Sequence, residues 1–258
     1  MRRLSDSVAG IAVVTGAGSG IGRATTLHCL DAGWHVIAID RQEDALSRLT
    51  DEAEGASLTR LAVQPLDVAD ALAVAAWAEG LAAHHGGEPV RALVNAAGVG
   101  LFARKLDTIT PDGWHRVLAV DLGGPFLMTK YLVPLMAPGS QIIHLSSVHA
   151  EATSFGMAAY ASAKAGLLAL TRATAIDYRR DGIRCNCLVI GSVDTPMSRQ
   201  HGEALAAEGL GAPALDPTLV AQPEAIAEVI EWLASGRASF VNGAAIRVDG
   251  GLLADLWP

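Results

Sequence analysis

The stretch "IAVVTGAGSGIG", residues 11–22, joins an apolar run typical of a buried strand to a turn with glycine at every second position from 16 to 22. A helical pattern follows, so the stretch predicts a strand, a tight turn and a helix. In such a turn Gly16 permits the sharp bend, Gly20 lets a phosphate approach the backbone, and Gly22 lets the helix pack closely on the strand. The free amides at the helix start attract phosphate. The stretch therefore predicts a dinucleotide-binding turn.

Strand and helix patterns alternate along the rest of the chain. Strands are predicted at 11–15, 35–39, 61–65, 91–95, 141–145, 183–190 and 245–248. Helices are predicted near 20–32, 42–53, 70–84, 111–136, 157–180 and 223–235. This alternation predicts an α/β, doubly wound fold in which seven parallel strands form one sheet with helices on both faces, as a single domain over residues 1–258. The Gly- and Pro-punctuated segment 191–222 is predicted to be an excursion that forms a substrate lid.

Composition and charge exclude several classes of protein. Of the 258 residues, 51% are apolar and 18% are charged, which excludes a disordered chain. The formal net charge is −8 and no run of five or six basic residues occurs, so we expect no nucleic-acid partner. No apolar run reaches the roughly 18 residues of a membrane span, and the start of the chain breaks into glycine too early for a secretory signal. We therefore expect no membrane association and a cytoplasmic location.

The cysteines and histidines do not form a metal-binding pattern. Cys29, Cys185 and Cys187 lack a C-x-x-C spacing and are predicted to be small buried apolar residues. The eight histidines lack a helical H-x-x-x-H pair. The sequence therefore predicts no metal site.

An acidic residue follows the second predicted strand. Asp40 lies 18 residues after Gly22, where a carboxylate accepts hydrogen bonds from the ribose of an adenosine. The same carboxylate repels a 2′-phosphate, and Ser19 in the turn carries no compensating charge. Arg41 is the counter-argument, because a guanidinium at this point binds phosphate. We predict NAD as the cofactor, with NADP as the alternative.

Four short motifs occur in a fixed order: "TGAGSGIG" at 15–22, "NAAG" at 95–98, "SS" at 146–147 and "YASAK" at 160–164. Together they resemble the classical short-chain dehydrogenase/reductase family, and the resemblance spans residues 11–251. The resemblance implies a Rossmann-like domain with a seven-stranded parallel sheet, assembled as a homotetramer or homodimer. It also implies hydride transfer between NAD or NADP and a small-molecule alcohol or ketone.

The resemblance also implies roles for individual residues. Tyr160 becomes the catalytic acid/base, Lys164 its activator, and Ser147, 13 residues before the tyrosine, the group that binds the substrate oxygen. Ser146 is expected to be structural. The predicted cofactor-binding residues are Gly16, Ser19, Gly20, Ile21, Gly22, Asp40, Arg41, Asp67, Val68, Asn95, Gly98, Tyr160, Lys164, Val193 and Thr195.

The spacing of Tyr160 and Lys164 has its own chemical reading. Residues four apart lie on one face of a helix, so the phenol and the ammonium project toward the same place. A free phenol has a pKa of about 10. A nearby ammonium and the positive ring of oxidised NAD favour the phenolate, so we predict that the pKa of Tyr160 is lowered. A lone Tyr-x-x-x-Lys is usually an ordinary helix surface, and it is the accompanying motifs that favour a catalytic pair.

Two positions depart from the family pattern. Asp121 in "VDLGGPF" stands where the family commonly has an asparagine that holds a water in a proton relay, and we include it among the predicted catalytic residues. A carboxylate at this point is predicted to compete for the ammonium of Lys164. "IG" at 190–191 replaces the usual Pro-Gly, which weakens the assignment of Val193 and Thr195.

The substrate is not defined by the sequence. His149 follows Ser147 in a stretch similar to that of bacterial glucose dehydrogenases, which points to a polyhydroxylated substrate, although a satisfied loop histidine is the plainer interpretation. Apolar residues of the predicted lid point instead to a cyclic, steroid-like or aromatic alcohol: Met197, Leu205, Leu210 and Leu215. Those leucines equally suit packing between helices. We leave both substrate classes open.

Two other functions compete with a dehydrogenase. A catalytically silent NAD-binding sensor or scaffold would keep the fold without turnover, and Asp121 is the feature that favours it. Sugar epimerases and dehydratases of the longer branch of the superfamily have a different glycine spacing and a larger substrate domain, for which 258 residues leave little room.

Overall fold

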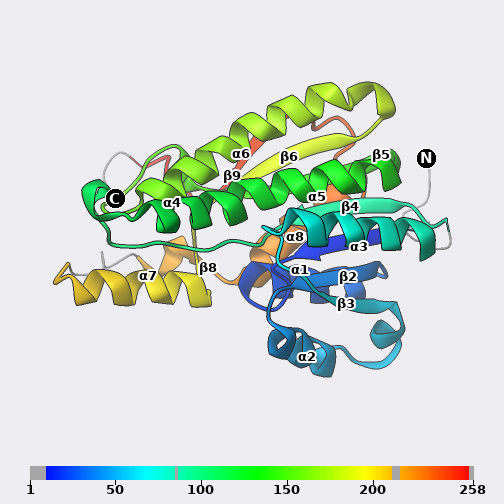
Figure 1. The fold of residues 1–258 in the computed structure, drawn as a ribbon, viewed down its shortest axis with the longest axis horizontal. Coiled ribbons are helices and arrows are strands. Elements are labelled where there is room, and N and C mark those ends of the chain that lie inside the picture. The colour runs from blue at the N-terminus through cyan, green and yellow to red at the C-terminus, as the bar shows by residue number, and fades with distance from the viewer. Residues whose placement is uncertain (1–9, 85–86, 211–215, 256–258) are drawn as a thin grey trace.

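The computed structural model describes residues 10–84, 87–210 and 216–255. Seven parallel strands form the central sheet in the order β3-β2-β1-β4-β5-β6-β9 (Figure 1). Their bounds are Ile11–Thr15 (β1), His35–Asp40 (β2), Leu61–Pro65 (β3), Val90–Asn95 (β4), Met136–Ser147 (β5), Arg184–Ile190 (β6) and Ala245–Val248 (β9). The predicted seven-stranded, doubly wound parallel sheet is confirmed.

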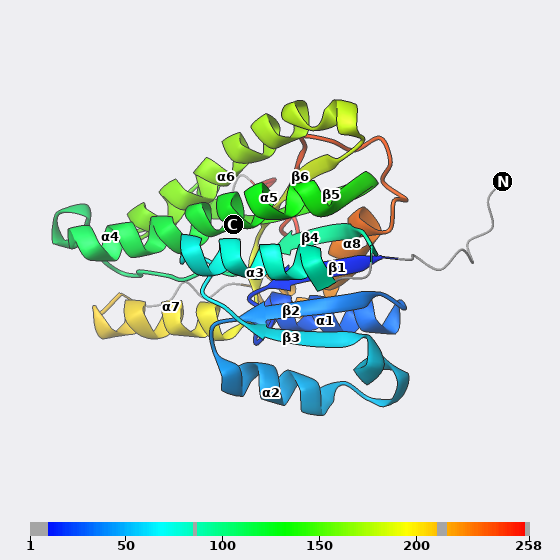
Figure 2. The same ribbon diagram turned by 45° about the vertical axis from the view of Figure 1, so that its right-hand side comes forward.

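Helices cover both faces of this sheet (Figures 1 and 2). One face packs against α1 (Gly20–Asp31), α2 (Glu43–Glu52) and α8 (Pro223–Ala234), and the other against α3 (Ala71–His84), α5 (Gly124–Leu132) and α6 (Ala158–Asp177). Successive side chains of β1 alternate between the two cores: Ala12 and Val14 join the first, Ile11 and Val13 the second. All five residues of β1 are buried, as expected of a strand covered on both faces.

The helix predicted over 111–136 is divided, which corrects that prediction. It consists of α4 (Pro111–Leu118), a π-helical turn (Ala119–Gly123) and α5, followed by a 3-10 turn (Val133–Leu135). Pro125 causes the division, because proline has no N–H to donate to the carbonyl of residue 121 and its ring crowds that carbonyl. The widened turn contains Asp121.

Strand β5 begins at Met136, five residues before its predicted start. Its pairing with β4 shifts register between Val90 and Ala92, and Gly139 in the extra segment has a φ of +96°. Only glycine adopts such a backbone readily. The apolar pattern predicts the regular part of β5 from residue 141 on and does not predict the irregular segment before it.

Strands β1 and β4 are paired up to their carboxyl ends, and the connections that follow them run to opposite faces of the sheet. Such a switch point is where open α/β sheets bind ligands. The Thr15 hydroxyl bridges the two strand ends by accepting hydrogen bonds from the N–H groups of Ala96 and Ala97, each at 3.1 Å. The glycine turn of β1 and the "NAAG" turn of β4 are therefore held side by side.

The segment 191–222 carries its own secondary structure. Strands β7 (Ser192–Val193) and β8 (Val220–Ala221) form a small parallel pair, and α7 (Pro196–Ala207) lies between them in sequence. Both ribbon views show α7 at the same end of the molecule as α4. Leu205 is buried, Leu210 is 39% exposed, and Leu215 lies outside the described residues.

Three further sequence predictions concern buried and absent features. Cys29, Cys185 and Cys187 are free and buried, as predicted. Within the described ranges no helix is both long and apolar enough to cross a membrane. The same ranges contain no group of three or more His, Cys, Asp or Glu side chains arranged to hold a metal ion.

Candidate active site

A cavity of about 850 Å³ opens at the carboxyl ends of the strands, over the switch point. Most of the predicted site residues line it: Gly16, Ser19, Gly20, Ile21, Gly22, Asp40, Arg41, Asp67, Val68, Gly98, Ser147, His149, Tyr160, Lys164, Val193 and Thr195. Asn95 and Asp121 do not line the cavity. They lie behind its wall, with 2% and 0% of their surface exposed.

The glycine turn forms one end of the cavity and is built on close backbone contacts. A Cβ on Gly22 would lie 2.1 Å from the carbonyl oxygen of Gly16, and a Cβ on Gly16, where φ is +66°, would lie 2.8 Å from Ala97. Neither position accepts a side chain. Ser19 is the N-cap residue of α1, and its hydroxyl does not cap the helix. The turn thus presents bare backbone and a helix start to the cavity, which fits the pyrophosphate of a dinucleotide.

Asp40 is tied to this turn. Its Oδ2 accepts a hydrogen bond from the Gly18 N–H and its Oδ1 from the Gln42 N–H, both at 3.0 Å. The carboxylate is therefore fixed in direction by backbone groups on either side of it. It faces the cavity at the end of β2, as the ribose-binding interpretation requires.

Asp67 stands across the same end of the cavity. Its Oδ1 accepts from the Ala69 N–H at 2.9 Å, and its Oδ2 pairs with Arg116 of α4 at 3.2 Å. Burial alone raises the pKa of Asp67, but the Ala69 N–H and Arg116 outweigh burial and hold that pKa below its usual value. The carboxylate stays ionised with its second oxygen committed to Arg116.

Lys164 and Asp121 form a buried ion pair at the other end of the cavity. The Lys164 Nζ lies 3.2 Å from Asp121 Oδ2 and donates to the Leu145 carbonyl at 3.1 Å. Asp121 Oδ1 accepts from the Val99 N–H at 2.8 Å. The predicted competition of Asp121 for the lysine is present in the geometry. A Cβ on Gly98 would lie 3.2 Å from Asp121 Oδ2, so a side chain there would crowd the pair.

The two charges shift each other. Burial raises the pKa of Asp121, and the ammonium of Lys164 opposes that rise. Burial lowers the pKa of Lys164, but Asp121 outweighs burial and holds the lysine pKa above its usual value. The lysine is therefore a cation whose charge is largely matched by a carboxylate.

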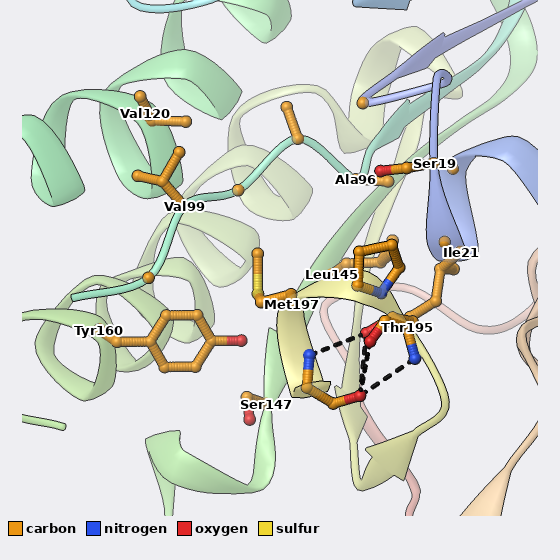
Figure 3. Close-up of a pocket in the computed structure, with 18 of the residues that line it drawn as sticks. Ser19, Ile21, Ala96, Val99, Val120, Leu145, Ser147, Tyr160, Thr195 and Met197 are labelled. Carbon is orange, nitrogen blue, oxygen red and sulfur yellow. Dashed lines mark hydrogen bonds between the residues drawn. The ribbon is translucent and has the colours of Figure 1, made fainter. Parts of the chain in front are cut away.

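Tyr160 points its phenol oxygen into the cavity, toward Met197, with Ser147 nearby (Figure 3). The Lys164 Nζ lies 5.3 Å from the centroid of its ring. Burial raises the pKa of Tyr160, Lys164 and the Ser147 hydroxyl lower it, and Asp121 raises it further. The net pKa from the protein groups alone is raised, whereas the predicted lowering also counts the positive ring of oxidised NAD and stays a prediction. The lysine acts in the expected direction, but burial and the neighbouring carboxylate outweigh it.

The two serines of the "SS" motif point to different partners. Ser147 ends β5 and its hydroxyl accepts from the His149 N–H at 3.3 Å. Ser146 is buried, and its hydroxyl donates to the carbonyl oxygen of Lys164 at 2.8 Å. Both serines line the cavity, but the Ser146 hydroxyl is committed to anchoring α6 to the sheet.

Asn95 contacts a buried histidine and not the cavity. Its Nδ2 lies 3.1 Å from Nδ1 of His144, which stands opposite it on β5. Burial, and next the charge of Lys164, lower the pKa of His144 to about 3. A neutral His144 thus links β4 and β5 behind the ion pair, and Asn95 belongs to the support of the cavity wall.

Thr195 and Val193 bring the start of α7 to the glycine turn. Thr195 is the N-cap residue of α7, and its hydroxyl accepts from the Ser198 N–H at 3.2 Å, within a capping box drawn in Figure 3. The Thr195 methyl lies 3.2 Å from the position of a Cβ on Gly20. The start of α7 therefore lies against the glycine turn, where Val193 and Thr195 line the cavity.

A family model described as enoyl-(acyl carrier protein) reductase matches residues 16–253. The chain belongs to the classical short-chain dehydrogenase/reductase family. An uncharacterized oxidoreductase of Bacillus subtilis is 35% identical over 258 residues, covering 96% of this chain and 92% of its own. Cis-4-hydroxycyclohexanecarboxylate dehydrogenase of Sinomonas cyclohexanicum is 37% identical over 254 residues, covering 95% and 96%. The solved structure of levodione reductase superposes with a TM-score of 0.85 at 26% identity, covering 95% of this chain and 98% of that one.

Membership in the short-chain dehydrogenase/reductase family defines the class of reaction. The chain is an oxidoreductase that transfers a hydride between a nicotinamide cofactor and an alcohol or ketone. The glycine turn, the acidic residue after β2 and the Tyr160 pocket fit such a cofactor in one continuous cavity.

Several residues of this short-chain dehydrogenase/reductase site have no signal in the sequence. Arg48 of α2 and Arg116 of α4 line the cavity beside Arg41. Phe102, on the loop after β4, and His201, on α7, line it beside Tyr160. Arg48 and Arg116 reach this end from two different helices, which no local sequence pattern unites. Phe102 and His201 come from segments about a hundred residues apart, so only the fold unites them.

Proposed function

We propose that this protein is an NAD-preferring dehydrogenase/reductase of secondary alcohols or ketones in which Tyr160 is the acid/base. The observation that carries the proposal is the phenol of Tyr160 pointing into a cavity whose wall also contains Ser147 and Lys164. The same cavity runs to the glycine turn. A substrate oxygen beside Tyr160 would therefore be within reach of a nicotinamide held by that turn.

In this proposal the protein manages one proton. The glycine turn and Asp40 would hold a nicotinamide dinucleotide, which would supply hydride transfer from the carbinol carbon or to a carbonyl carbon. As the hydride leaves, Tyr160 accepts the hydroxyl proton of the alcohol, and in the reverse direction it donates that proton to the carbonyl oxygen. Ser147 orients the same oxygen and stabilises its developing charge. Because the pKa of Tyr160 is raised by burial, alcohol oxidation should become faster as the pH rises.

Asp121 acts in this proposal as a positioning residue, because it touches Lys164 and not the cavity. It fixes the ammonium from one side while the Leu145 carbonyl fixes it from another. Its charge also weakens the pull of the lysine on the phenol. A buried carboxylate in this place therefore tunes the acid/base and does not itself move the substrate proton.

Asp40 supports the preference for NAD. Its carboxylate is held in place by two backbone amides and faces the part of the cavity that would receive the adenosine ribose. A 2′-phosphate there would meet a fixed negative charge. Arg41 and Arg48, which also line this end, make no ion pair among the described residues and support the NADP alternative.

The lid, the assembly and the location are further parts of the proposal. We propose that the segment 191–222 closes over substrate, supported by the contact of Thr195 with the glycine turn.

A homotetramer or homodimer is supported by exposed apolar side chains on the long helices, Phe126 of α5 at 49% and Ile176 of α6 at 63%. Sedimentation velocity tests the assembly. The cytoplasmic location stays a prediction.

The deciding experiment is a substrate panel read by nicotinamide absorbance in both directions, with NAD and with NADP. The relatives are named for cyclohexanol, 2,3-butanediol and hydroxyacyl-CoA dehydrogenases, which suggests a panel of ring alcohols, diols and hydroxyacyl thioesters with their ketones. Turnover of any secondary alcohol or ketone supports the proposal. Cofactor binding without turnover across the panel would favour the silent sensor or scaffold instead.

A further inference from the structure

Four rings form one continuous wall of the cavity around the reaction end. Phe102 lies 4.9 Å from His201 and 6.2 Å from Tyr160, measured between ring centroids. His149 lies 6.0 Å from Tyr160 and 6.2 Å from His201. These separations are those of rings in contact. Three segments distant in sequence therefore combine into a single surface: the loop after β4, the β5–α6 connection with α6, and α7. We name these four residues the ring wall.

The loop that carries Phe102 is shaped for this arrangement. A Cβ on Gly100 would lie 1.8 Å from the Phe102 ring, so the ring folds back over a glycine. Ala103 has a φ of +55°, a strained backbone for a residue other than glycine. A Cβ on Gly156 would lie 2.5 Å from the Ala103 Cα, which shows how closely the loop is packed on its neighbour. The position of Phe102 is thus built into the backbone.

The other members of the ring wall are also held. Arg104 follows the strained alanine, and its guanidinium nitrogen lies 3.9 Å from a carboxylate oxygen of Glu208, just beyond α7. This ion pair is a second contact between the two segments that Phe102 and His201 also join. The His149 Nδ1 lies 3.2 Å from the Thr153 hydroxyl. The His201 Nε2 is buried and has no hydrogen-bond partner among the described residues. The wall is therefore fixed and mostly apolar, with one unsatisfied ring nitrogen.

Apart from Lys164, which is paired with Asp121, the formally charged lining residues lie in the other parts of the cavity. The acidic and guanidinium side chains that line it are Asp40, Arg41, Arg48, Asp67 and Arg116, all at the nucleotide end. At the reaction end the charged lining residue is Lys164, and Asp121 pairs with it. Burial, and next the charge of His201, lower the pKa of His149 to about 4, and burial lowers that of His201, so both rings are neutral near pH 7. An anionic substrate would be desolvated here without a free counter-charge.

We propose that the ring wall selects a neutral cyclic secondary alcohol, or its ketone, over open-chain and anionic substrates of similar size. This inference rests on the proposed function and names the substrate class of the same site. A saturated ring is rigid, loses little conformational freedom on binding and presents a broad face to aromatic side chains. Phe102 is the specificity-determining residue, because its ring joins the loop to α7 above the phenol of Tyr160. In the ring wall, the His201 Nε2 is the buried ring nitrogen that has no partner within the described ranges and is left to bind a further hydroxyl of a polyhydroxylated substrate.

The test compares kcat/KM for cyclohexanol, 2-hexanol and cis-4-hydroxycyclohexanecarboxylate with NAD. We expect cyclohexanol to exceed each of the others by about tenfold or more, the scale of discrimination that shape gives in an apolar pocket. Phe102→Leu should remove most of the preference for the ring over the chain. Gly100→Ala keeps phenylalanine at position 102, but its new methyl group would displace the Phe102 ring, so it should have the same effect. Phe240→Leu, at a fully exposed phenylalanine, is the matched control and should change nothing.

Two kinds of failure are distinguishable. Equal or better turnover of 2-hexanol or of the carboxylate, or an unchanged preference in both variants, overturns the inference and leaves the proposed function intact. Absence of turnover with all three compounds counts against the proposed function. In that case thermal-shift titrations of the enzyme with NAD and each compound still decide the inference, because they need no chemistry: tighter binding of the ring supports it, and equal or weaker binding contradicts it.

Discussion

The charges at the two ends of the cavity differ in how deeply they are buried. At the nucleotide end Asp40 and Asp67 are partly exposed and are fixed by backbone amides of Gly18, Gln42 and Ala69. At the reaction end Lys164 and Asp121 are buried and are fixed mainly by each other. The carboxylates at the nucleotide end are held in fixed directions, so they select a ligand by the position of its polar groups. The pair at the reaction end shifts the protonation of its neighbours, because buried charges are screened little by water.

This difference separates two kinds of consequence. A change at the nucleotide end alters which cofactor is preferred and leaves the fold nearly as stable, since water replaces what is lost. A change at the reaction end alters proton transfer and stability together, since no water replaces a missing buried partner. The predictions below test this separation, from the largest expected effect to the smallest.

Tyr160→Phe removes the proton-transferring oxygen and should lower kcat by about 100-fold or more, the usual contribution of a positioned acid/base. Cofactor affinity, measured by fluorescence titration with NADH, should change little, because the glycine turn and Asp40 are untouched. Tyr131→Phe, on α5 and outside the cavity, serves as the control. Full activity in Tyr160→Phe would reject the acid/base assignment.

Asp121→Leu should destabilise the protein by about 3–5 kcal/mol in urea unfolding, because it leaves the buried ammonium of Lys164 without its partner. Asp121→Asn keeps an oxygen for the Val99 N–H and should be milder. In that variant the pH–rate profile of alcohol oxidation should move to lower pH, because Asp121 raises the pKa of Tyr160 and the substitution removes its charge. An unmoved profile would show that the carboxylate has a structural role alone.

His144→Gln tests the buried support of the reaction end through acid stability. The pKa of His144 is about 3 in the folded protein, below the usual 6.5, so between these values the unfolded chain binds the extra proton. The free energy of unfolding of the wild type should therefore fall as the pH falls, by about 3 kcal/mol from this residue between pH 6.5 and pH 4. His144→Gln should lose that part of the decline. Exposed His35→Gln should keep it, and an equal slope in all three proteins would contradict the prediction.

Asp40→Ser should shift the ratio of kcat/KM for NADP over NAD by about tenfold toward NADP, because a fixed negative charge is replaced by a hydroxyl beside Arg41 and Arg48. The melting temperature should move little. Glu43→Ser removes the same charge from an exposed position outside the cavity and is the control. A shift of equal size in the control would mean that net charge, and not the site, sets the preference.

Local patterns predicted the parts of the site that one segment builds. The glycine turn and Asp40 lie next to predicted strands, and Tyr160 and Lys164 share one helix turn, so their positions follow from secondary structure. The effect of burial on the Tyr160 pKa did not follow, because burial depends on every segment that closes the cavity. Phe102 was missed for the same reason: its ring contacts are made by residues from two other parts of the chain, α6 and α7.

One error was avoidable from the sequence. Pro125 interrupts a helical pattern, and a proline in that position prevents a regular helix through residue 121. The apolar spacing on either side was strong enough to suggest a single helix over 111–136. The break was visible in the residue type, whereas the widened turn it produces, with Asp121 inside, required the structure.

That widened turn has a geometric consequence for the rod formed by α4 and α5. Val117 and Met128 are eleven positions apart, which in an uninterrupted α-helix places them nearly in line along one side. Here Val117 packs with Ala159 and Ala163 of α6, and Met128 packs in the core beneath the sheet. A π-helical turn contains more residues than an α-helical turn, so it changes the helical phase of α5 relative to α4. The two helices thereby pack in two different apolar clusters, and Asp121 lies in the turn between them.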